Sequence, residues 1–438
     1  MSGARDALVV GGGLAGLASA YALHEAGYRV EVLERREDVA LETSFANGGI
    51  LTPSMPDPWN APGVHWRLLR WLGREDAPML LRPGAIPGYF GWGLKFLAGS
   101  SPDAFNASMR ANYRLCAYSL ERLRAWRAAL DLEYAHSTHG TLEVYRDPRS
   151  FAQAVHELAT LAPLGLEGTP LDPAGTARLE PLLGEVQGDL AGAIHFPADE
   201  SGDAWLFCRA LRECLVARGV TLRLDTRVSG VRIAGGRATG VETSGGFLPA
   251  SQVVLAAGPW SRELLAACGV RVAVRPVKGY SLSIPIDPAS GPRHALSDDS
   301  LHAVMTPLGA TLRLAGTAEF SGWDMTLRPK RVEALWRLLA ALSPTLARQV
   351  ERTTARPWCG LRPMSADGRP YVGASAVAGL YVNTGHGHLG WTQAAGSASL
   401  LAQLMTGAPT AIDPRPFALA RAERRAWRRE IQPVEQPS

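Results

Sequence analysis

Three glycines near the N-terminus have the spacing of a phosphate-binding turn. Gly11, Gly13 and Gly16 follow a short apolar run and open an alanine- and leucine-rich segment. In such a unit the first glycine permits the sharp turn, the second lets the backbone approach a pyrophosphate, and the third lets the helix pack on its strand. Glu34 ends the next β-branched run, where a carboxylate binds ribose hydroxyls and disfavours the 2′-phosphate of NADP. The pattern predicts dinucleotide binding, with a purely structural glycine turn as the alternative.

Further along the chain, an arginine is held between a glycine-containing turn and a proline, in residues 359–364. This residue, Arg362, has a planar guanidinium fork, which pairs bidentately with a carboxylate. We therefore expect Arg362 to bind the α-carboxylate of the substrate, with an arginine on a surface loop as the alternative. Arg369 is expected to stay on the surface.

A glycine-rich turn joins a strand to a helix in residues 383–392. Its glycines let the backbone approach a planar ligand, and the helix N-terminus can stabilise negative charge that develops on that ligand. His386 and His388 lie in this turn without an acidic or cysteine neighbour, so no metal site is predicted. We expect one imidazole to line the pocket and the other to be structural, with a general-base role for either as the alternative.

Hydrophobic patterning predicts the elements that position these residues. The N-terminal unit has a strand at 6–10, a helix that ends before Gly27 and a strand at 29–33. The apolar run 253–256 leads into a glycine, as a parallel strand does where it ends at a cofactor. Further strands are expected at 140–145, 193–196, 221–224, 228–233, 238–243, 280–285, 310–316 and 380–383. Further helices are expected at 109–130, 151–161, 206–218, 329–342 and 389–404.

These elements predict a nucleotide-binding domain assembled from discontinuous segments. Residues of about 1–50, 140–265 and 355–438, with some interleaved segments, are assigned to it, and residues of about 51–139 and 266–354 to an inserted substrate-binding or cap domain. The stretch 51–99, rich in proline, glycine and tryptophan, predicts irregular structure and short helices over the binding site. The fold class is therefore α/β (α+β), with a Rossmann-like domain joined to a mostly antiparallel β-sheet.

The bulk properties are those of an ordinary globular protein. The chain has 438 residues, and 46% of them are apolar, which excludes disordered and fibrous classes. A formal net charge of +4 is small and dispersed, so nucleic acid is not expected as a partner. Five cysteines without a C-x-x-C pair suggest neither a disulfide framework nor a zinc site, and they fit a reducing cytosol. Neither a membrane-spanning segment nor a signal sequence is expected.

Several segments together resemble the small subunit of bacterial D-amino-acid dehydrogenase, within the D-amino-acid oxidase and glycine oxidase superfamily. They are residues 9–16, 41–49 (LETSFANGG), 59–64 (WNAPGV), 199–203 (DESGD), 277–282 (VKGYSL), 360–364 (GLRPM) and 383–392 (NTGHGHLGWT). The resemblance implies a glutathione-reductase-type FAD-binding fold. It also implies hydride transfer from the α-carbon of a D-amino acid to flavin N5, hydrolysis of the imino acid by water, and transfer of the electrons to a quinone or other carrier.

The resemblance also assigns roles to single residues. Arg362 and Tyr280 are assigned to the substrate carboxylate, and with His386 and His388 they are the candidate catalytic residues. Ser44, Asn47 and Gly48 resemble contacts to the flavin side of FAD, and Val228 a contact to adenine. The full set of expected cofactor contacts is Gly11, Gly13, Leu14, Ala15, Gly16, Glu34, Arg35, Ser44, Asn47, Gly48, Val228, Ala257, Gly258, Arg362, Gly387, Leu389, Gly390, Trp391 and Thr392.

Two departures from the family pattern bear on the substrate. Gly49 and Ile50 stand where broad-specificity enzymes usually have alanine and glutamine, and His388 replaces the commoner threonine. A narrower or cyclic substrate, such as D-proline or cis-4-hydroxy-D-proline, is one interpretation. An oxygen-using oxidase of glycine, sarcosine or another secondary amine is an alternative. A non-catalytic or nucleic-acid-modifying flavoprotein is an alternative of another class.

Aromatic and basic residues in 66–72 bear on contact with a membrane. The residues are Trp66, Leu69, Trp71 and Leu72 with Arg67 and Arg70. They suit docking on lipid to reach quinone, but a lid packed on the substrate domain explains the same residues and is preferred. The basic stretch 421–429, which contains Trp427, is expected to be a solvated terminal helix. We expect a cytoplasmic protein, with peripheral attachment to the inner membrane as an alternative.

Overall fold

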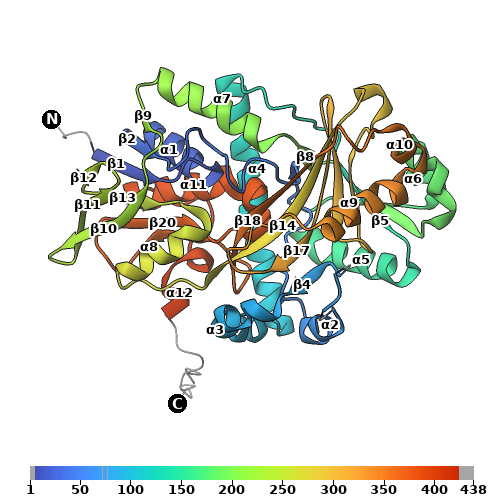
Figure 1. Cartoon of the computed structure of the whole chain (residues 1–438), viewed down its shortest axis with the longest axis horizontal. Coiled ribbons are helices and arrows are strands. Elements are labelled where there is room, and N and C mark those ends of the chain that lie inside the picture. Colours follow the sequence, from blue (N-terminus) through green and yellow to red (C-terminus); the bar gives the residue numbers. More distant parts are fainter. Residues whose placement is uncertain (1–4, 72, 76, 424–438) are drawn as a thin grey trace, which may run out of the picture.

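The computed structural model describes residues 5–71, 73–75 and 77–423 of the chain (Figure 1). A six-stranded sheet, here the parallel sheet, forms the left half of Figure 1, and a nine-stranded sheet, here the antiparallel sheet, extends to the right. Leu72 and most of the basic stretch 421–429 lie outside the described residues. The expected α/β class with a second, mostly antiparallel sheet is confirmed.

The parallel sheet contains the predicted N-terminal unit. Its strand order is β19-β20-β13-β1-β2-β9, and neighbours are parallel except β19 and β20. The strands are β1 (Arg5–Val10), β2 (Tyr28–Leu33), β9 (Thr221–Arg223), β13 (Val253–Leu255), β19 (Tyr371–Ala374) and β20 (Leu380–Thr384). The last four residues of β1 (7–10) and all of β13 are buried on both faces, which explains their uninterrupted apolar sequences.

Helices cover one face of the parallel sheet. They are α1 (Leu14–Glu25), α4 (Pro102–Leu130), α7 (Ala204–Ala217) and α11 (Gly390–Thr406), which share one apolar core with the sheet. The other face packs on α8 (Ser261–Ala267) and on a small sheet of β10 (Val228–Ala234), β11 (Arg237–Thr243) and β12 (Gly246–Pro249). Helix α4 begins at Pro102 rather than at the predicted residue 109, because Ser101 caps it by accepting from the N–H of Ala104.

The antiparallel sheet has the strand order β18-β14-β17-β16-β15-β5-β7-β6, and β4 pairs with β17. Its strands are β4 (Met79–Leu81), β5 (Thr141–Tyr145), β6 (Thr169–Leu171), β7 (Gly192–Phe196), β14 (Val274–Pro285), β15 (Ala295–Asp298), β16 (Ala303–Leu308), β17 (Thr311–Phe320) and β18 (Arg356–Ser365). Helices α9 (Pro329–Leu342) and α10 (Pro344–Gln349) pack on one of its faces.

Sheet membership differs from the predicted domain limits. Strands β5, β6 and β7 fall within residues 140–265, and β18 falls within residues 355–438, yet all four belong to the antiparallel sheet. Helix α4, within residues 51–139, packs instead on α1 and α11 beside the parallel sheet. The pairing of β5 with β15 joins segments far apart in the chain, and periodicity within one segment carries no information about such a partner.

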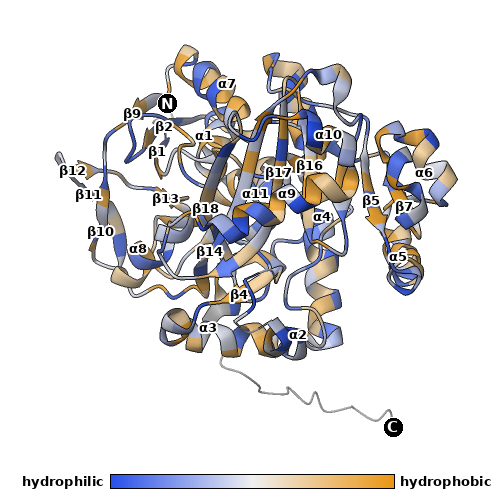
Figure 2. Ribbon diagram, turned by 45° about the vertical axis from the view of Figure 1, so that its right-hand side comes forward, coloured by the Kyte–Doolittle hydropathy of each residue, from blue (hydrophilic) through white to orange (hydrophobic). Residues whose placement is uncertain are grey.

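Two helices lie together at one end of the molecule, at the bottom of Figures 1 and 2. They are α2 (Val64–Trp71) and α3 (Ile86–Ala98), the short helices expected in the stretch 51–99. The remaining elements are β3 (Ile50–Leu51), α5 (Pro148–Leu161), α6 (Pro173–Leu179), β8 (Glu200–Ser201) and α12 (Ala420–Glu423). No described helix is both long and apolar enough to cross a membrane.

Candidate active site

One cavity of about 970 Å³ is lined by residues of both large sheets. Apart from Gly16, every predicted cofactor-binding and catalytic residue contributes to its wall. The cavity therefore gathers the N-terminal turn, the loop 44–49, Arg362 and the turn before α11 in one place. Gly16 lies behind the turn, where a Cβ would be 1.8 Å from the carbonyl oxygen of Gly11, so a glycine is needed for close packing.

The N-terminus of α1 forms the nucleotide end of the cavity. Gly13, the N-cap residue, offers no side-chain cap, and apart from Leu14, whose N–H donates to Ser44, the first N–H groups of the helix remain available for a phosphate. Gly11 has φ +114°, and a Cβ there would lie 2.7 Å from the carbonyl oxygen of Ala256. Glu34 accepts from the N–H of Gly12 at 2.6 Å and from the N–H of Arg36 at 3.0 Å, which fixes its carboxylate at the end of β2. These residues fit the pyrophosphate and ribose of a dinucleotide.

An aromatic and basic group borders the same end. The guanidinium of Arg35 lies 3.6 Å from the ring centre of Trp260 and pairs with Glu42 at 2.5 Å. Val228, expected at the adenine, and Ala257 and Gly258, expected in the wall beside the cofactor, line the cavity as well.

The loop 44–49 forms the floor towards the antiparallel sheet. Ser44 Oγ accepts from the N–H of Leu14 at 3.2 Å, which ties the loop to the start of α1. On the other side, Arg313 donates to the carbonyl oxygen of Asn47 at 2.9 Å, and Thr306 to that of Gly48 at 2.7 Å. The loop is thus held between the two sheets, where the flavin of a bound FAD is expected.

The turn before α11 closes the opposite wall. Gly385 and Gly387 have φ +85° and +59°, a left-handed conformation that favours glycine. The helix that follows points its N-terminus at the cavity, and no described side chain caps it. Its N–H groups can therefore stabilise negative charge at the edge of a planar cofactor.

Arg362 lies on β18 with its guanidinium at the cavity wall. Its Nη1 donates to the carbonyl oxygen of Thr317 at 3.0 Å, and its Cζ lies 5.6 Å from the ring centre of Trp59. Burial lowers the pKa of Arg362 to about 10, so it is charged at neutral pH. No carboxylate of the described residues pairs with it, and a ligand carboxylate would supply the missing counter-charge. The glycine at position 279 leaves space for the Arg362 guanidinium, because a Cβ there would lie 2.2 Å from Nη1.

Thr317, beside Arg362, has a strained backbone. Its φ is +59°, which is unfavourable for a β-branched residue. The side chain is 9% exposed, and its hydroxyl has no hydrogen-bond partner in the described part of the chain. Strain and unsatisfied polar groups are typical of functional sites, so Thr317 is a second candidate for contact with substrate. Sequence reasoning missed it, because a threonine gives no signal of a positive φ.

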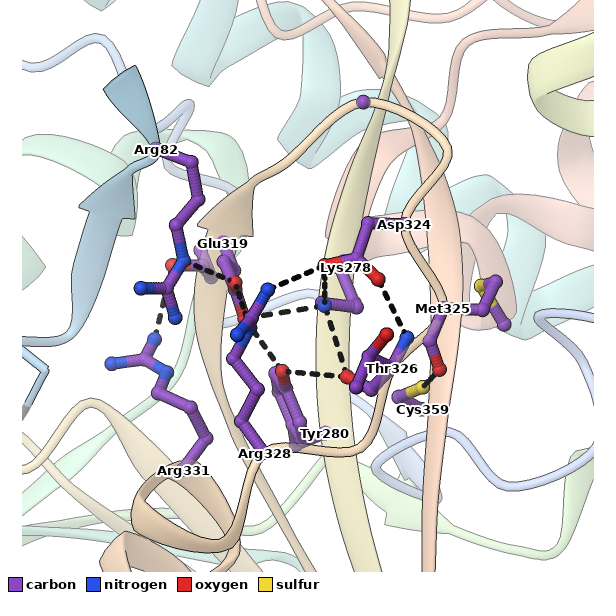
Figure 3. A network of polar contacts seen from close by, with 12 residues as sticks. Arg82, Lys278, Tyr280, Glu319, Asp324, Met325, Thr326, Arg328, Arg331 and Cys359 are labelled. Carbon is purple, nitrogen blue, oxygen red and sulfur yellow. Dashed lines mark hydrogen bonds and ion pairs between the residues drawn. The ribbon is translucent and has the colours of Figure 1, made fainter. Parts of the chain in front are cut away.

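Tyr280 lies on the opposite face of the antiparallel sheet from Arg362, which corrects the expectation that both bind one carboxylate. Val277 pairs with Arg362 across β14 and β18, so their side chains share a face. Tyr280 follows Val277 by three residues, and successive side chains on a strand alternate between faces. Its hydroxyl donates to Glu319 at 2.5 Å, within the polar network of Figure 3 that also contains Lys278. The Tyr280 hydroxyl is therefore hydrogen-bonded on the face of the sheet opposite Arg362.

The two histidines of the turn have different surroundings. His388 stacks on Trp59, with ring centres 5.0 Å apart and planes inclined by 18°. His386 is buried, with its Nε2 3.1 Å from Ser397 Oγ in α11. Burial lowers the pKa of His386 to about 4, and burial together with the charge of Arg362 lowers that of His388 to about 3. Both imidazoles are neutral at pH 7 and weakly basic, which favours a place in the wall over proton transfer.

Comparison with known proteins agrees with this geometry. The sequence profile of the FAD dependent oxidoreductase family matches residues 6–404. The chain belongs to this family. The D-amino acid dehydrogenase of Paramagnetospirillum magneticum is 40% identical over 92% of this chain and 96% of its own length. That of Methylobacterium nodulans is 40% identical over 91% of this chain and 95% of its own.

Solved structures of FAD dependent oxidoreductases share the fold. Glycine oxidase from Geobacillus kaustophilus matches with a TM-score of 0.75 and 23% identity, over 95% of this chain and 98% of the other. L-proline dehydrogenase from P. horikoshii matches with a TM-score of 0.77 and 18% identity, over 96% of this chain and 98% of the other. The protein is an FAD-dependent oxidoreductase, and the expected family, fold, cofactor and enzyme class are confirmed.

Proposed function

We propose that this flavoenzyme oxidises the Cα–N bond of a D-amino acid and passes the electrons to a carrier such as a quinone. The main support is Arg362, a guanidinium without a counter-charge among the described residues, in the cavity that contains the FAD-binding turn. The relatives at 40% identity, which are D-amino acid dehydrogenases, support the choice of a D-amino acid. Bound FAD supplies the hydride acceptor.

Arg362 and Thr317 have the central part in this proposal. The guanidinium fork binds the α-carboxylate in two places and so limits rotation of the substrate about its α-carbon. The Thr317 hydroxyl, without a partner among the described residues, is a further donor. The substrate amine loses its proton to water, the α-hydrogen leaves as hydride, and water hydrolyses the imino acid to a 2-oxo acid and ammonia. The proposal needs no base from His386 or His388, which agrees with their lowered pKa values.

Two departures from the family pattern, at Gly49 with Ile50 and at His388, favour a cyclic substrate. His388 stacks on Trp59 at the cavity wall, where it can shape the substrate site. A Cβ at Gly49, in contrast, would meet Leu308 and Thr306 of the antiparallel sheet. D-proline and cis-4-hydroxy-D-proline are therefore included among the compounds tested, but the proposed substrate is not limited to cyclic amino acids.

An exposed apolar face on α3 supports contact with a membrane, where quinone is found. Ile86, Phe90, Leu94 and Leu97 are 42%, 67%, 57% and 40% exposed, and their spacing puts them on one face of the helix. The opposite face of α3 packs on the antiparallel sheet. Trp66 of α2, which lies at the same end of the molecule, is 69% exposed (Figures 1 and 2). An apolar helix face of this kind suits the interfacial region of a bilayer.

Docking on lipid would need Trp71 on the outer surface of the protein, but the residue lies elsewhere. It lines the cavity, and its ring lies 6.4 Å from that of His302, edge to face. Arg67 lines the cavity as well. These two residues fit the lid interpretation, so the proposed membrane surface consists of the exposed face of α3 together with Trp66.

The proposal is tested by anaerobic reduction of the flavin absorbance with D- and L-amino acids, glycine, sarcosine, D-proline and cis-4-hydroxy-D-proline. Bleaching by D-amino acids, followed by slow reoxidation in air and fast reoxidation by a quinone analogue, is expected. Bleaching by glycine or sarcosine with fast peroxide formation would favour the oxidase. Failure of every compound to bleach the flavin would overturn the proposal and favour a non-catalytic or nucleic-acid-modifying flavoprotein.

A further inference from the structure

The cavity has an acidic half beyond Arg362. Four carboxyl groups line it, from the loop after β3, from β5, from α5 and from the end of β15: they are Asp57, Glu143, Glu157 and Asp299. None of the described basic side chains forms an ion pair with Asp57, Glu143 or Asp299. Arg67 and His302 also reach this half, where desolvation lowers the pKa of His302, so the positive charge of Arg67 faces four carboxyl groups. Negative charge therefore dominates this part of the wall.

This acidic half is continuous with the Arg362 end. The ring of Trp59 connects the two, because Arg362 Cζ lies 5.6 Å from its centre and His388 stacks on it at 5.0 Å. Asp57 lies two residues before Trp59, and its backbone is hydrogen-bonded to His388. The charges of Asp57 and Asp299 in turn act on Glu143. A ligand held by Arg362 thus has the carboxyl groups next along the cavity.

Without a ligand, the negative charges of these carboxyl groups repel one another. Desolvation within the cavity wall, followed by the charge of Glu157, raises the pKa of Asp57, although this residue is accessible to solvent. Burial raises the pKa of Glu143 to about 7; a hydrogen bond with Tyr145 lowers it, and the charges of Asp299 and Asp57 raise it. Uncompensated carboxylates in a cavity are stabilised by a cation. The described residues contain no group of three or more metal-ligating side chains, so a metal ion is not the cation indicated.

We propose that the substrate is a D-amino acid whose side chain ends in an amine or a guanidine. The α-carboxylate binds Arg362, and the side-chain cation lies among Asp57, Glu143 and Asp299. This inference rests on the proposed function and names its substrate class. The unpartnered hydroxyl of Thr317, a residue that is 9% exposed, lies in the same cavity beside Arg362 and supports a polar ligand at that end.

Matched substrate pairs test the inference in the holoenzyme. D-arginine is compared with D-citrulline, and D-lysine with D-norleucine, because each pair has similar size and differs in charge. The measured quantity is the second-order rate constant of anaerobic flavin reduction. We expect this constant to be about 10- to 100-fold higher for the charged member of each pair, as for charge-assisted hydrogen bonds.

Two variants separate the charge of the wall from its shape. In Glu143→Gln the ratio of D-arginine to D-citrulline should fall, because the carboxylate is lost while the shape is kept. In Glu333→Gln, which changes an exposed carboxylate on α9 away from the cavity, the ratio should stay at the wild-type value. Asp57→Asn provides the same test if Glu143→Gln does not bind flavin.

The outcomes distinguish this inference from the proposed function. Equal reduction by the charged and neutral members of both pairs, or a clear preference for D-proline, would overturn the inference and leave the proposed function standing. Failure of all D-amino acids to reduce the flavin would overturn the proposed function itself.

Discussion

Arg362 donates a hydrogen bond from Nη1 to the carbonyl oxygen of Thr317 at 3.0 Å, which joins β18 to β17 at the cavity wall. We expect Arg362→Ala to keep its yellow cofactor but to raise the Kd for a D-amino acid by about 100-fold, because a buried charge partner is lost. The dependence of anaerobic flavin reduction on substrate concentration measures this Kd. Normal turnover by the variant would remove Arg362 from the site.

Gly279→Ala probes the space that Arg362 occupies. A Cβ at this position would lie 2.2 Å from the Arg362 guanidinium, which must then move. We expect a rise in KM of about 10-fold or more with unchanged flavin content, because misplacement of a binding group by about 1 Å weakens its action. Gly184→Ala is the matched control, since nothing lies within 4 Å of its added Cβ. Equal kinetics of the two variants would contradict the proposed place of the substrate.

Glu34→Ala tests the nucleotide end of the cavity. The Glu34 carboxylate accepts from two backbone N–H groups in or near the turn and is 8% exposed. We expect the Kd for FAD to rise by about 10- to 100-fold, as for loss of a hydrogen bond to a charged group. Flavin retained after gel filtration, and fluorescence titration of the apoprotein, report the change. Glu37→Ala, at a side chain that is 71% exposed, is the control and should bind FAD like the wild type.

The buried carboxyl of Asp199 predicts a pH dependence of stability. Burial raises its pKa to about 7, although Ser54 and Thr141 donate to it at 2.5 and 2.6 Å. A raised folded-state pKa stabilises the fold below the unfolded pKa, and this stability is lost as pH rises through about 7. The free energy of unfolding should therefore fall with pH by up to about 1.4 kcal/mol per unit from this group between about pH 4 and 7.

Asp199→Asn removes this titration. Denaturation in urea at pH 5 and pH 8 should show the variant gaining about 2–3 kcal/mol relative to the wild type at the higher pH. A stability difference between the two proteins that is the same at both pH values would show that Asp199 does not titrate in this range.

The α3 surface predicts binding to lipid. Phe90→Glu combined with Leu94→Glu puts two charges on its exposed apolar face, and we expect co-sedimentation with liposomes to fall by about 10-fold or more. Val216→Glu, at a 53% exposed apolar side chain on α7, is the control and should leave binding unchanged. Retention of liposome binding by the double variant would overturn the proposed surface, while anaerobic flavin reduction should be the same in all three proteins.

Several elements could be predicted from the sequence because their signals are local. The glycine turn before α1, the strand β2 that ends near Glu34, and the helix α9 are formed by residues close together in the chain. Turn geometry, strand alternation and helix periodicity act over a few residues, so they can be inferred without knowing the fold. The start of α4 was placed too late, because its first turns carry no apolar periodicity and depend on the cap at Ser101.

The side-chain partners in the antiparallel sheet could not be predicted in this way. Tyr280 and Arg362 lie on strands β14 and β18, and only the register between these strands shows that their side chains point to opposite faces. Thr317 is a functional candidate only because a local strain and an unpaired hydroxyl coincide beside Arg362. Both facts depend on contacts between segments that are remote in sequence.

The sequence by itself determined the dinucleotide turn, the family and the cofactor, since each depends on short motifs in order along the chain. The tertiary structure decided which strands share a sheet, which face each side chain takes, and that four carboxyl groups line the cavity that contains Arg362. The physical reason is that charge and burial are properties of a place in space. Asp57, Glu143 and Asp299 are ordinary acidic residues in the chain, and they become a single charged surface only where the fold brings them together.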